Sequence, residues 1–381
     1  MTAASSHPQS SSLRPHKILV RGVNWLGDAV MSAPALQCLR EAKPAAHITL
    51  LTHQKLAGLW QDHPAINEIQ TFATGQGAWR VGQQLRAGKF DLALALPNSH
   101  RSAIELWLAG IPERVGYARP FRNFFLTKSI RARDEAVLMR KRSHSEINRL
   151  IARPGGAPRT NLPTAAHHIF QYLHLVAALG AKPEALAPHI SVSEKEVSAF
   201  RRRVIEVSGS GPTHWLGLNP GAEYGPAKRW PAERFIAAAL EINKTVRCGW
   251  IIFGVNDPAT LRVAGELESK LGRASVANFS GRTTLRELCA GLKFCELVLT
   301  NDSGPMHVAA AVGTPVVVPF GSTSSTLTGP GLPGSDGHVV FQSSIPCAPC
   351  FLRECPIDFR CMNSIEVAGV VDACLRRLGK L

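Results

Sequence analysis

The chain has 381 residues, of which 45% are hydrophobic and 19% charged, with nine cysteines and a formal net charge of +15. This balance excludes a disordered chain and a disulfide scaffold, and no apolar run approaches the roughly 20 residues that span a bilayer. A single core rarely exceeds roughly 250–300 residues, so we expect two domains. The Ser-rich start, Met1 to Pro15, lacks the apolar segment of a signal peptide, which indicates a disordered tail on a cytoplasmic protein.

The first half of the chain alternates short apolar runs with helical patterns. We expect strands at residues 17–23, 47–53, 68–72 and 90–97, and helices at 29–43, 78–89 and 101–110. The strands are continuous apolar runs, which is typical of a parallel sheet covered on both faces. Such strand–helix alternation predicts βαβ units.

The second half repeats this scheme after a Pro- and Ala-rich linker at 180–193. We expect strands at 215–221, 249–255, 296–301 and 315–321, and helices at 232–244, 258–271, 284–295 and 304–313. The sequence therefore predicts an α/β protein with two Rossmann-like, doubly wound domains, at 16–185 and 186–362, facing a central cleft. A last helix within 363–381 is expected to pack back on the N-terminal domain.

The positive charge is concentrated in the first half. Residues 1–190 carry 23 basic and 11 acidic residues, whereas residues 191–381 carry 20 and 17, and the densest basic stretch is 114–142. Such a field attracts a polyanion, although a solvated basic face has the same pattern. No helix-turn-helix, zinc-finger or RNA-recognition signature occurs, so we expect an anionic membrane surface or a phosphorylated glycolipid as partner, and no nucleic acid.

The first candidate site is the turn Gly22-Val-Asn-Trp-Leu-Gly-Asp28, where a buried strand passes into a helix. Asp28 stands where a helix N-cap belongs, and it is either an ordinary cap or a reactive carboxylate at the cleft. Pro34 is tolerated only near the start of a helix, so the first turns are expected to be irregular. The turn matches neither a Walker A loop nor G-x-G-x-x-G, which argues against a dehydrogenase.

The second candidate site is the loop 219–231, which follows the strand WLGLN. Three Pro and two Gly hold this loop in one irregular shape. Lys228 and Arg229 project from it. A lysine binds phosphate as a point charge, and an arginine binds two phosphate oxygens at once through its forked guanidinium. The alternative is a surface basic pair beside a packed Trp.

The third candidate site is Thr300-Asn-Asp-Ser-Gly-Pro-Met-His307, between a strand and a helix. Pro305 suits the first turn of a helix, and small residues leave backbone N–H groups accessible. A helix N-terminus of this kind is a ready site for an anion such as a diphosphate, although an ordinary capped helix fits the pattern too.

Four cysteines near the C-terminus, Cys347, Cys350, Cys355 and Cys361, have the spacing C-x2-C-x4-C-x5-C. Such a cluster holds zinc or an iron–sulfur centre in some proteins. The spacing is tighter than in paired zinc knuckles, and we favour reduced or partly buried thiols without a metal. Arg353, Arg360 and the neighbouring prolines indicate a compact loop over the cleft.

Several catalytic patterns are absent from the sequence. No Asp-x-Asp pair occurs, whereas metal-dependent sugar transfer generally needs two carboxylates to hold a cation on the diphosphate. We therefore expect no required cofactor and neutralisation of phosphate charge by Lys, Arg and helix dipoles. The absence of G-x-S-x-G and H-E-x-x-H argues against serine hydrolases and zincins.

The segments GVNWLGDAVMSAPAL (22–36), PGAEYGPAKRWP (220–231) and TNDSGPMHVAAAVGTPVV (300–317) together resemble the bacterial lipopolysaccharide heptosyltransferases, glycosyltransferase family 9. PNSHRSA at 97–103 and the loop 220–231 are most similar to the heptosyltransferase II branch. The resemblance extends from Lys17 to nearly the end of the chain. The cysteine cluster, found only in some members, and the Ser-rich tail depart from the pattern.

This resemblance implies the GT-B fold and an inverting transfer of L-glycero-D-manno-heptose from ADP-heptose to a heptose on the Kdo–lipid A core. Asp28 matches the general base of the family. The residues that we expect to bind the nucleotide-sugar donor are Lys228, Glu223, Asp302, Ser303, Gly304, His307 and Asp257. Those that we expect to bind the acceptor are Asn24, Trp25, Asn98, Arg101, Arg119 and Arg122.

Two other functions remain compatible with the sequence. One is a heptosyltransferase of the same fold with a different acceptor, of type I or III. The other is a non-catalytic protein that binds nucleotides or polyanions, which would need the basic stretch but no carboxylate at Asp28.

Overall fold

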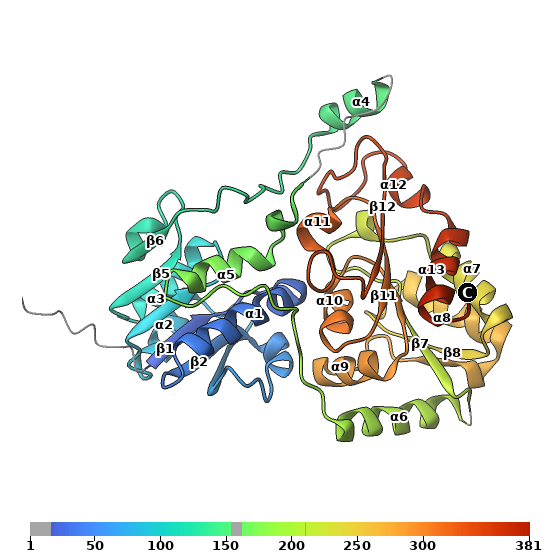
Figure 1. The fold of residues 1–381 in the computed structure, drawn as a ribbon, viewed down its shortest axis with the longest axis horizontal. Coiled ribbons are helices and arrows are strands. Elements are labelled where there is room, and N and C mark those ends of the chain that lie inside the picture. The colour runs from blue at the N-terminus through green and yellow to red at the C-terminus, as the bar shows by residue number, and fades with distance from the viewer. Residues whose placement is uncertain (1–16, 154–161, 210) are drawn as a thin grey trace, which may run out of the picture.

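The computed structural model describes residues 17–153, 162–209 and 211–381, so the expected N-terminal tail lies outside the described residues. It contains two six-stranded parallel sheets, ordered β3-β2-β1-β4-β5-β6 and β12-β11-β10-β7-β8-β9. Counted from its own first strand, each sheet has the order 3-2-1-4-5-6 of a dinucleotide-binding fold. The two doubly wound domains predicted from the sequence are therefore confirmed, and they lie side by side in Figure 1.

The N-terminal domain has its strands at the positions expected from the apolar runs, plus two more. The strands are β1 (Lys17–Arg21), β2 (His47–His53), β3 (Glu68–Phe72), β4 (Leu92–Ala95), β5 (Glu113–Tyr117) and β6 (Lys128–Ile130). The helices are α1 (Leu26–Ala42), α2 (Ala78–Arg86), α3 (His100–Leu108), α4 (His144–Ala152) and α5 (Ile169–Ala177). Short 3₁₀ helices lie at Gln54–Leu59, Asn123–Phe125 and Thr164–Ala166.

The C-terminal domain repeats the alternation. Its strands are β7 (His214–Asn219), β8 (Cys248–Ile252), β9 (Val276–Asn278), β10 (Val298–Thr300), β11 (Val316–Phe320) and β12 (Val339–Gln342). Its helices are α6 (Glu194–Ser208), α7 (Ala232–Thr245), α8 (Pro258–Leu271), α9 (Leu285–Phe294), α10 (Gly304–Ala311), α11 (Ser325–Thr328), α12 (Arg360–Asn363) and α13 (Val367–Arg377). Further 3₁₀ helices lie at Pro226–Lys228 and Arg273–Ser275.

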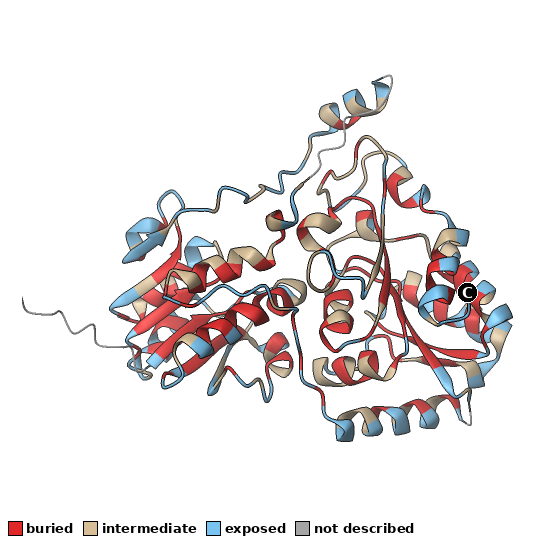
Figure 2. Cartoon of the chain, in the orientation of Figure 1, coloured by how far each residue is buried: buried red, intermediate tan, exposed pale blue. Residues whose placement is uncertain are grey.

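The central strands are buried along their whole length, as their sequences require. Every residue of β4, β8 and β11 is buried (Figure 2), because helices cover both faces of each sheet. The strands that the sequence did not reveal are β5, β6, β9 and β12, which lie at or next to sheet edges. Edge strands carry more polar residues, so their apolar signal is weak. Basic residues of the stretch 114–142 interrupt the apolar pattern of β5 and β6, so these two strands were not predicted.

Helix α1 differs from the expectation in two ways. It begins at Leu26 with Trp25 at the N-cap, so Asp28 lies in the first turn and is not the cap. The helix also continues through Pro34 to Ala42, although we expected irregular first turns. Three of its first four N–H groups have no partner within the helix, and a carboxylate in the first turn is stabilised there by the helix dipole.

A long excursion from the N-terminal domain reaches over to the C-terminal domain. After β6 the chain runs along the top of Figure 1, forms α4, and returns to α5. We call the described parts of this segment, 131–153 and 162–168, the arm. Ile147 packs on Cys347 and Cys350, and the Arg142 backbone N–H donates to the Cys350 carbonyl oxygen over 3.0 Å. The arm thus ties the basic stretch to the cysteine loop.

The end of the chain packs differently from the expectation. Helix α13, within the expected terminal segment 363–381, packs against α7 and β11 of the C-terminal domain and not on the N-terminal domain. Its buried Val370 and Cys374 join the core that contains Trp230 and Phe235. The apolar positions of this helix complete one face of the second sheet, which explains the packing. No helix in the described ranges is long and apolar enough to cross a membrane.

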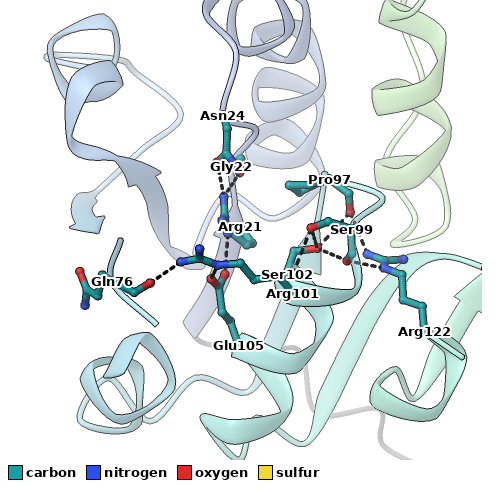
Figure 3. A network of polar contacts seen from close by, with 10 residues as sticks. All are labelled: Arg21, Gly22, Asn24, Gln76, Pro97, Ser99, Arg101, Ser102, Glu105 and Arg122. Atoms are coloured by element: carbon teal, nitrogen blue, oxygen red, sulfur yellow. Dashed lines mark hydrogen bonds and ion pairs between the residues drawn. The ribbon is translucent and has the colours of Figure 1, made fainter. Parts of the chain in front are cut away.

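A buried ion pair fixes the strand end that leads to Asp28. Arg21, at the end of β1, donates from Nε to Glu105 Oε2 over 2.9 Å, and both side chains are almost fully buried. The same guanidinium donates to the Gly22 carbonyl and to Asn24 Oδ1, as Figure 3 shows. Glu105 also accepts from Arg101, whose side chain is 45% exposed. This network therefore sets the path of the turn before α1.

We predict that Glu105→Gln lowers the free energy of unfolding by about 3–5 kcal/mol, because Arg21 would stay buried without its counter-charge. Urea unfolding followed by tryptophan fluorescence measures this change. Arg101→Gln is the matched control, since it removes the half-exposed partner and should cost at most about 1 kcal/mol. Equal destabilisation by the two variants would contradict a structural role for the buried pair.

Candidate active site

A cleft of about 920 Å³ lies between the two domains. Its walls come from the start of α1, from the loops that follow β7 and β8, and from the start of α10. In each sheet the strand order reverses between two neighbouring strands, β1 and β4 in the N-terminal domain and β7 and β10 in the C-terminal domain. The loops that follow β1, β7 and β10 begin at these points. Ligands of open parallel sheets bind beyond such reversal points, so the topology and the cavity indicate the same site.

The two domains meet most closely where α1 and α10 start. A Cβ atom added to Gly27 would lie 2.7 Å from His307 Cδ2, and one added to Gly304 would lie 2.8 Å from Leu26 Cβ. Real side chains do not approach so closely, so both positions require glycine. We call this pair of contacts the glycine interlock. It brings the first turn of α1 directly against the first turn of α10.

Asp28 points into the cleft from the N-terminal domain and is partly exposed. Its Oδ1 accepts a hydrogen bond from the Tyr172 hydroxyl over 3.3 Å, and His168 Nδ1 lies 3.9 Å away. Burial and the neighbouring Asp28 carboxylate raise the pKa of Tyr172 well above its usual value, so the phenol remains a donor. The carboxylate is thus oriented from one side and open on the other.

Lys228 and Asp302 form the main ion pair on the opposite wall. Lys228 Nζ lies 2.6 Å from Asp302 Oδ2, which also accepts from the Thr323 hydroxyl over 2.5 Å. Asp302 is buried and Lys228 nearly so. Asp302 therefore holds the Lys228 ammonium close to the N-terminus of α10.

Asparagine side chains tie the loops after β7 and β10 together. Asn219 Nδ2 donates to Thr300 Oγ1 and to Ser303 Oγ, each over 3.0 Å. Asn301 Oδ1 accepts from the Trp230 backbone N–H over 2.8 Å. The first turn of α10, at Ser303 and Gly304, lines the cleft, and the N–H groups of a first helical turn have no partner within the helix, so this turn suits an anion.

His307 lies beneath this turn and is 5% exposed. Burial lowers its pKa to about 4, and Asp302 and Asp28 only partly offset that effect. The imidazole is therefore neutral near pH 7 and serves as a packing group. It is the residue against which Gly27 packs.

The remaining predicted donor residues divide into two groups. Glu223 lines the cleft and forms an ion pair with Lys55 of the N-terminal domain over 3.3 Å. Asp257 does not line the cleft; it caps α8 and pairs with Arg229 over 3.0 Å. Arg229 is thereby directed away from the site, so of the basic pair in this loop only Lys228 lines the cleft.

Of the predicted acceptor residues, the cleft includes Trp25. Asn24, Asn98, Arg101 and Arg119 lie outside its lining, and the last two are solvent-exposed. Asn24 accepts from Arg21, and Arg101 pairs with Glu105, so both belong to the network of Figure 3.

Arg122 is fully buried and does not line the cleft. Its guanidinium donates to the carbonyl oxygens of Pro97, Ser99 and Tyr117, at the carboxyl ends of two strands. Burial lowers its pKa to about 10, which still leaves it charged near neutral pH. Arg122 therefore supports the sheet edge in this structure, and an acceptor contact would require it to leave these three carbonyls.

Several residues in or next to the cleft could not be predicted from their local sequence. His168 and Tyr172 reach Asp28 from the end of the arm and from α5, 140 and more residues away. Met139 and Lys141 of the arm also line the cleft. None of them lies in a recognisable motif. Arg353 does line the cleft, as expected of the loop around the cysteines, whereas Arg360 pairs with Asp358 and does not.

The four clustered cysteines surround a much smaller cavity of about 10 Å³. Burial raises the pKa of Cys347 and Cys350, and that of Cys361 to about 12, which favours the neutral thiol over the thiolate. Within the described ranges, no three His, Cys, Asp or Glu side chains have the geometry of a metal site. The thiols pack with Ile147 of the arm and support the loop that carries Arg353.

Comparison with known proteins gives consistent matches over most of the chain. A model of glycosyltransferase family 9 (heptosyltransferase) matches residues 78–146 and 157–359. Lipopolysaccharide heptosyltransferase 2 of Salmonella typhimurium is 31% identical over 323 residues, covering 82% of this chain and 85% of the relative. The protein of the same name from Escherichia coli K12 has the same identity and coverage.

The same resemblance is found among solved structures. The E. coli ADP-heptose LPS heptosyltransferase II structure matches with a TM-score of 0.74 and 27% identity, covering 95% of this chain and 98% of that one. A glycosyltransferase family 9 structure from Veillonella parvula matches with a TM-score of 0.73 at 23% identity, covering 96% and 98%. Both matches extend over both domains and therefore include the cleft between them.

Proposed function

This chain belongs to glycosyltransferase family 9, the heptosyltransferase family, and we propose that it transfers L-glycero-D-manno-heptose from ADP-heptose to a heptose of the Kdo–lipid A inner core. The observation that carries the proposal is the arrangement of the cleft. One wall presents the carboxylate of Asp28, and the facing wall presents Lys228 and the N-terminus of α10. A hydroxyl nucleophile and a diphosphate leaving group need such an arrangement.

The donor half of the reaction belongs to the C-terminal domain. The diphosphate of ADP-heptose lies against Lys228 and the N–H groups at Ser303 and Gly304, while Asp302 keeps Lys228 in place. Negative charge grows on the leaving diphosphate as the sugar departs. Donors fixed in advance stabilise that charge without reorganising, which is commonly the largest contribution to catalysis.

The acceptor half depends on Asp28. Its open oxygen accepts the proton of the acceptor hydroxyl as that hydroxyl attacks the anomeric carbon from the face opposite the diphosphate, so the configuration inverts. Tyr172 and His168 hold the other side of the carboxylate. A positioned base of this kind contributes roughly 10²–10⁴ in rate.

Charge neutralisation without a metal is part of the proposal. The sequence has no Asp-x-Asp pair, and the carboxylates of the donor wall already have cationic or hydroxyl partners. Lys228 and the α10 dipole supply the positive charge that a cation would otherwise provide.

Transfer by the purified protein tests the proposed function directly. We predict that ADP-heptose and heptosyl-Kdo₂-lipid A give a product heavier by one heptose in mass spectrometry, with and without a chelator. Asp28→Asn should lower turnover by roughly 10²–10⁴ while ADP binding by calorimetry stays near wild type.

A panel of truncated core acceptors identifies the acceptor in the same assay. Transfer to Kdo₂-lipid A lacking heptose, or only to a longer core, would replace this function with that of a type I or type III enzyme. ADP binding without transfer to any member of the panel would favour a non-catalytic protein, and full turnover of Asp28→Asn would remove Asp28 as the base.

We also propose that the protein works in the cytoplasm, peripherally bound to the anionic inner face of the membrane that holds its acceptor. Exposed basic residues within 114–142 support this, namely Arg119, Lys128, Arg131, Arg140 and Lys141. Exposed apolar side chains lie among them: Phe121 is 88% exposed, Phe124 77% and Leu138 74%. Basic residues near an anionic surface contribute about 1 kcal/mol each, and apolar side chains add insertion into the interface.

Co-sedimentation with phospholipid vesicles tests this location. We predict binding to vesicles that contain anionic lipid, release at roughly 1 M salt where the Debye length is about 3 Å, and weak binding to neutral vesicles. Binding that ignores both salt and lipid charge would contradict it.

A further inference from the structure

The cations that line the cleft are not equally available to a ligand. Lys228 already forms a 2.6 Å ion pair with Asp302, so much of its charge is compensated before any donor binds. The diphosphate of a nucleotide-sugar donor carries a negative charge on each phosphate, and the compensated Lys228 alone does not balance both charges. Among the described residues of the cleft, Arg353 and Lys141 are the Lys or Arg side chains that have no carboxylate within 4.0 Å.

Arg353 and Lys228 both lie against the ring of Tyr224. Its guanidinium carbon lies 5.2 Å from the centre of the Tyr224 ring, and Lys228 Nζ lies 5.1 Å from that centre. Lys141, in contrast, comes from the arm of the N-terminal domain, next to Met139. The position of Arg353 therefore makes it a partner of Lys228 on the donor wall.

The backbone around Arg353 is fixed against the loop that carries Lys228. The Ala227 N–H donates to the Arg353 carbonyl oxygen over 3.0 Å, and the Tyr224 hydroxyl donates to the Phe351 carbonyl oxygen over 2.8 Å. Gly225 has φ +150°, and a Cβ there would lie 2.5 Å from the Arg353 carbonyl oxygen. The Tyr-Gly pair of this loop thus serves to dock the 351–353 segment.

The cysteine loop secures this segment from its other side. The N–H groups of Cys350 and Phe351 both donate to the Ser322 carbonyl oxygen, over 3.0 and 2.7 Å. Ser322 follows β11 and precedes Thr323, which binds Asp302. The loop around the cysteines therefore positions Arg353 at the cleft.

We infer that Arg353 is a second diphosphate-binding residue, whose guanidinium fork binds the phosphate oxygens of the donor together with Lys228. The inference rests on the proposed function, because it takes the nucleoside diphosphate of a sugar donor as the ligand. A guanidinium binds two phosphate oxygens at once, whereas an ammonium acts as a point charge. Its position over the Tyr224 ring restricts the guanidinium before the ligand arrives.

Calorimetric titration with ADP and with AMP tests the inference on the full-length protein. We expect Arg353→Gln to weaken ADP binding by about tenfold or more, as for loss of a charge-assisted hydrogen bond, and AMP binding much less. Arg353→Lys should recover only part of the ADP affinity, since it keeps the charge but not the fork.

Arg202→Gln is the control, because it makes the same change of net charge at an exposed position of α6 that does not line the cleft. It should leave both affinities at the wild-type value. Thermal unfolding midpoints should agree among all variants, since Arg353 is exposed.

The outcomes separate this inference from the function on which it rests. Wild-type ADP affinity in Arg353→Gln, or an equal loss for ADP and AMP, would overturn the inference while the proposed function stands. A wild-type protein that binds no ADP would overturn both. If Arg353→Lys recovered the full ADP affinity, binding of two phosphate oxygens by the guanidinium would be overturned, and only an effect of the positive charge would remain.

Discussion

The glycine interlock between α1 and α10 is the contact on which the site depends. Gly27 packs against His307 and Gly304 packs against Leu26, with no space for a Cβ at either position. Each domain is a complete doubly wound sheet with its own ligand-binding edge, and neither edge alone holds both the proposed base and the proposed diphosphate site. The interlock sets these edges face to face, so that a carboxylate from one domain and an anion site from the other share one cleft.

The electrostatics of the cleft follow from this placement. Asp28 keeps one side open because Tyr172 and His168 occupy the other, and His307 between the domains is neutral because burial lowers its pKa to about 4. A charged imidazole at that position would attract the Asp28 carboxylate, which we propose as the proton acceptor. On the wall that we propose for the donor, Asp302 positions Lys228 and offsets its positive charge, which leaves a role for a further cation.

The sequence predicted the parts of this protein that depend on local signals. Buried strands such as β4 and β11 stand out as apolar runs, and the helix start at Gly304 follows from Ser303, Gly304 and Pro305. Edge strands such as β6 were not predicted, because their exposed and partly exposed residues form no continuous apolar run. His168 and Tyr172 could not be predicted, since their contact with Asp28 arises only when the arm returns to pack beside α1. The prediction of Asp28 as the helix N-cap was wrong, because the actual N-cap is Trp25, whose side chain makes no capping hydrogen bond.

The turnover of Gly27→Ala, measured together with its ADP affinity and thermal midpoint, shows whether the glycine interlock positions Asp28. The added methyl would lie 2.7 Å from His307, so we predict a loss of turnover of at least about tenfold, the effect of a misplaced carboxylate, with ADP affinity nearly unchanged. Gly265→Ala in α8, where the Cβ meets open space, should behave as wild type. Wild-type turnover of Gly27→Ala would contradict the claim that this close contact between the domains positions Asp28.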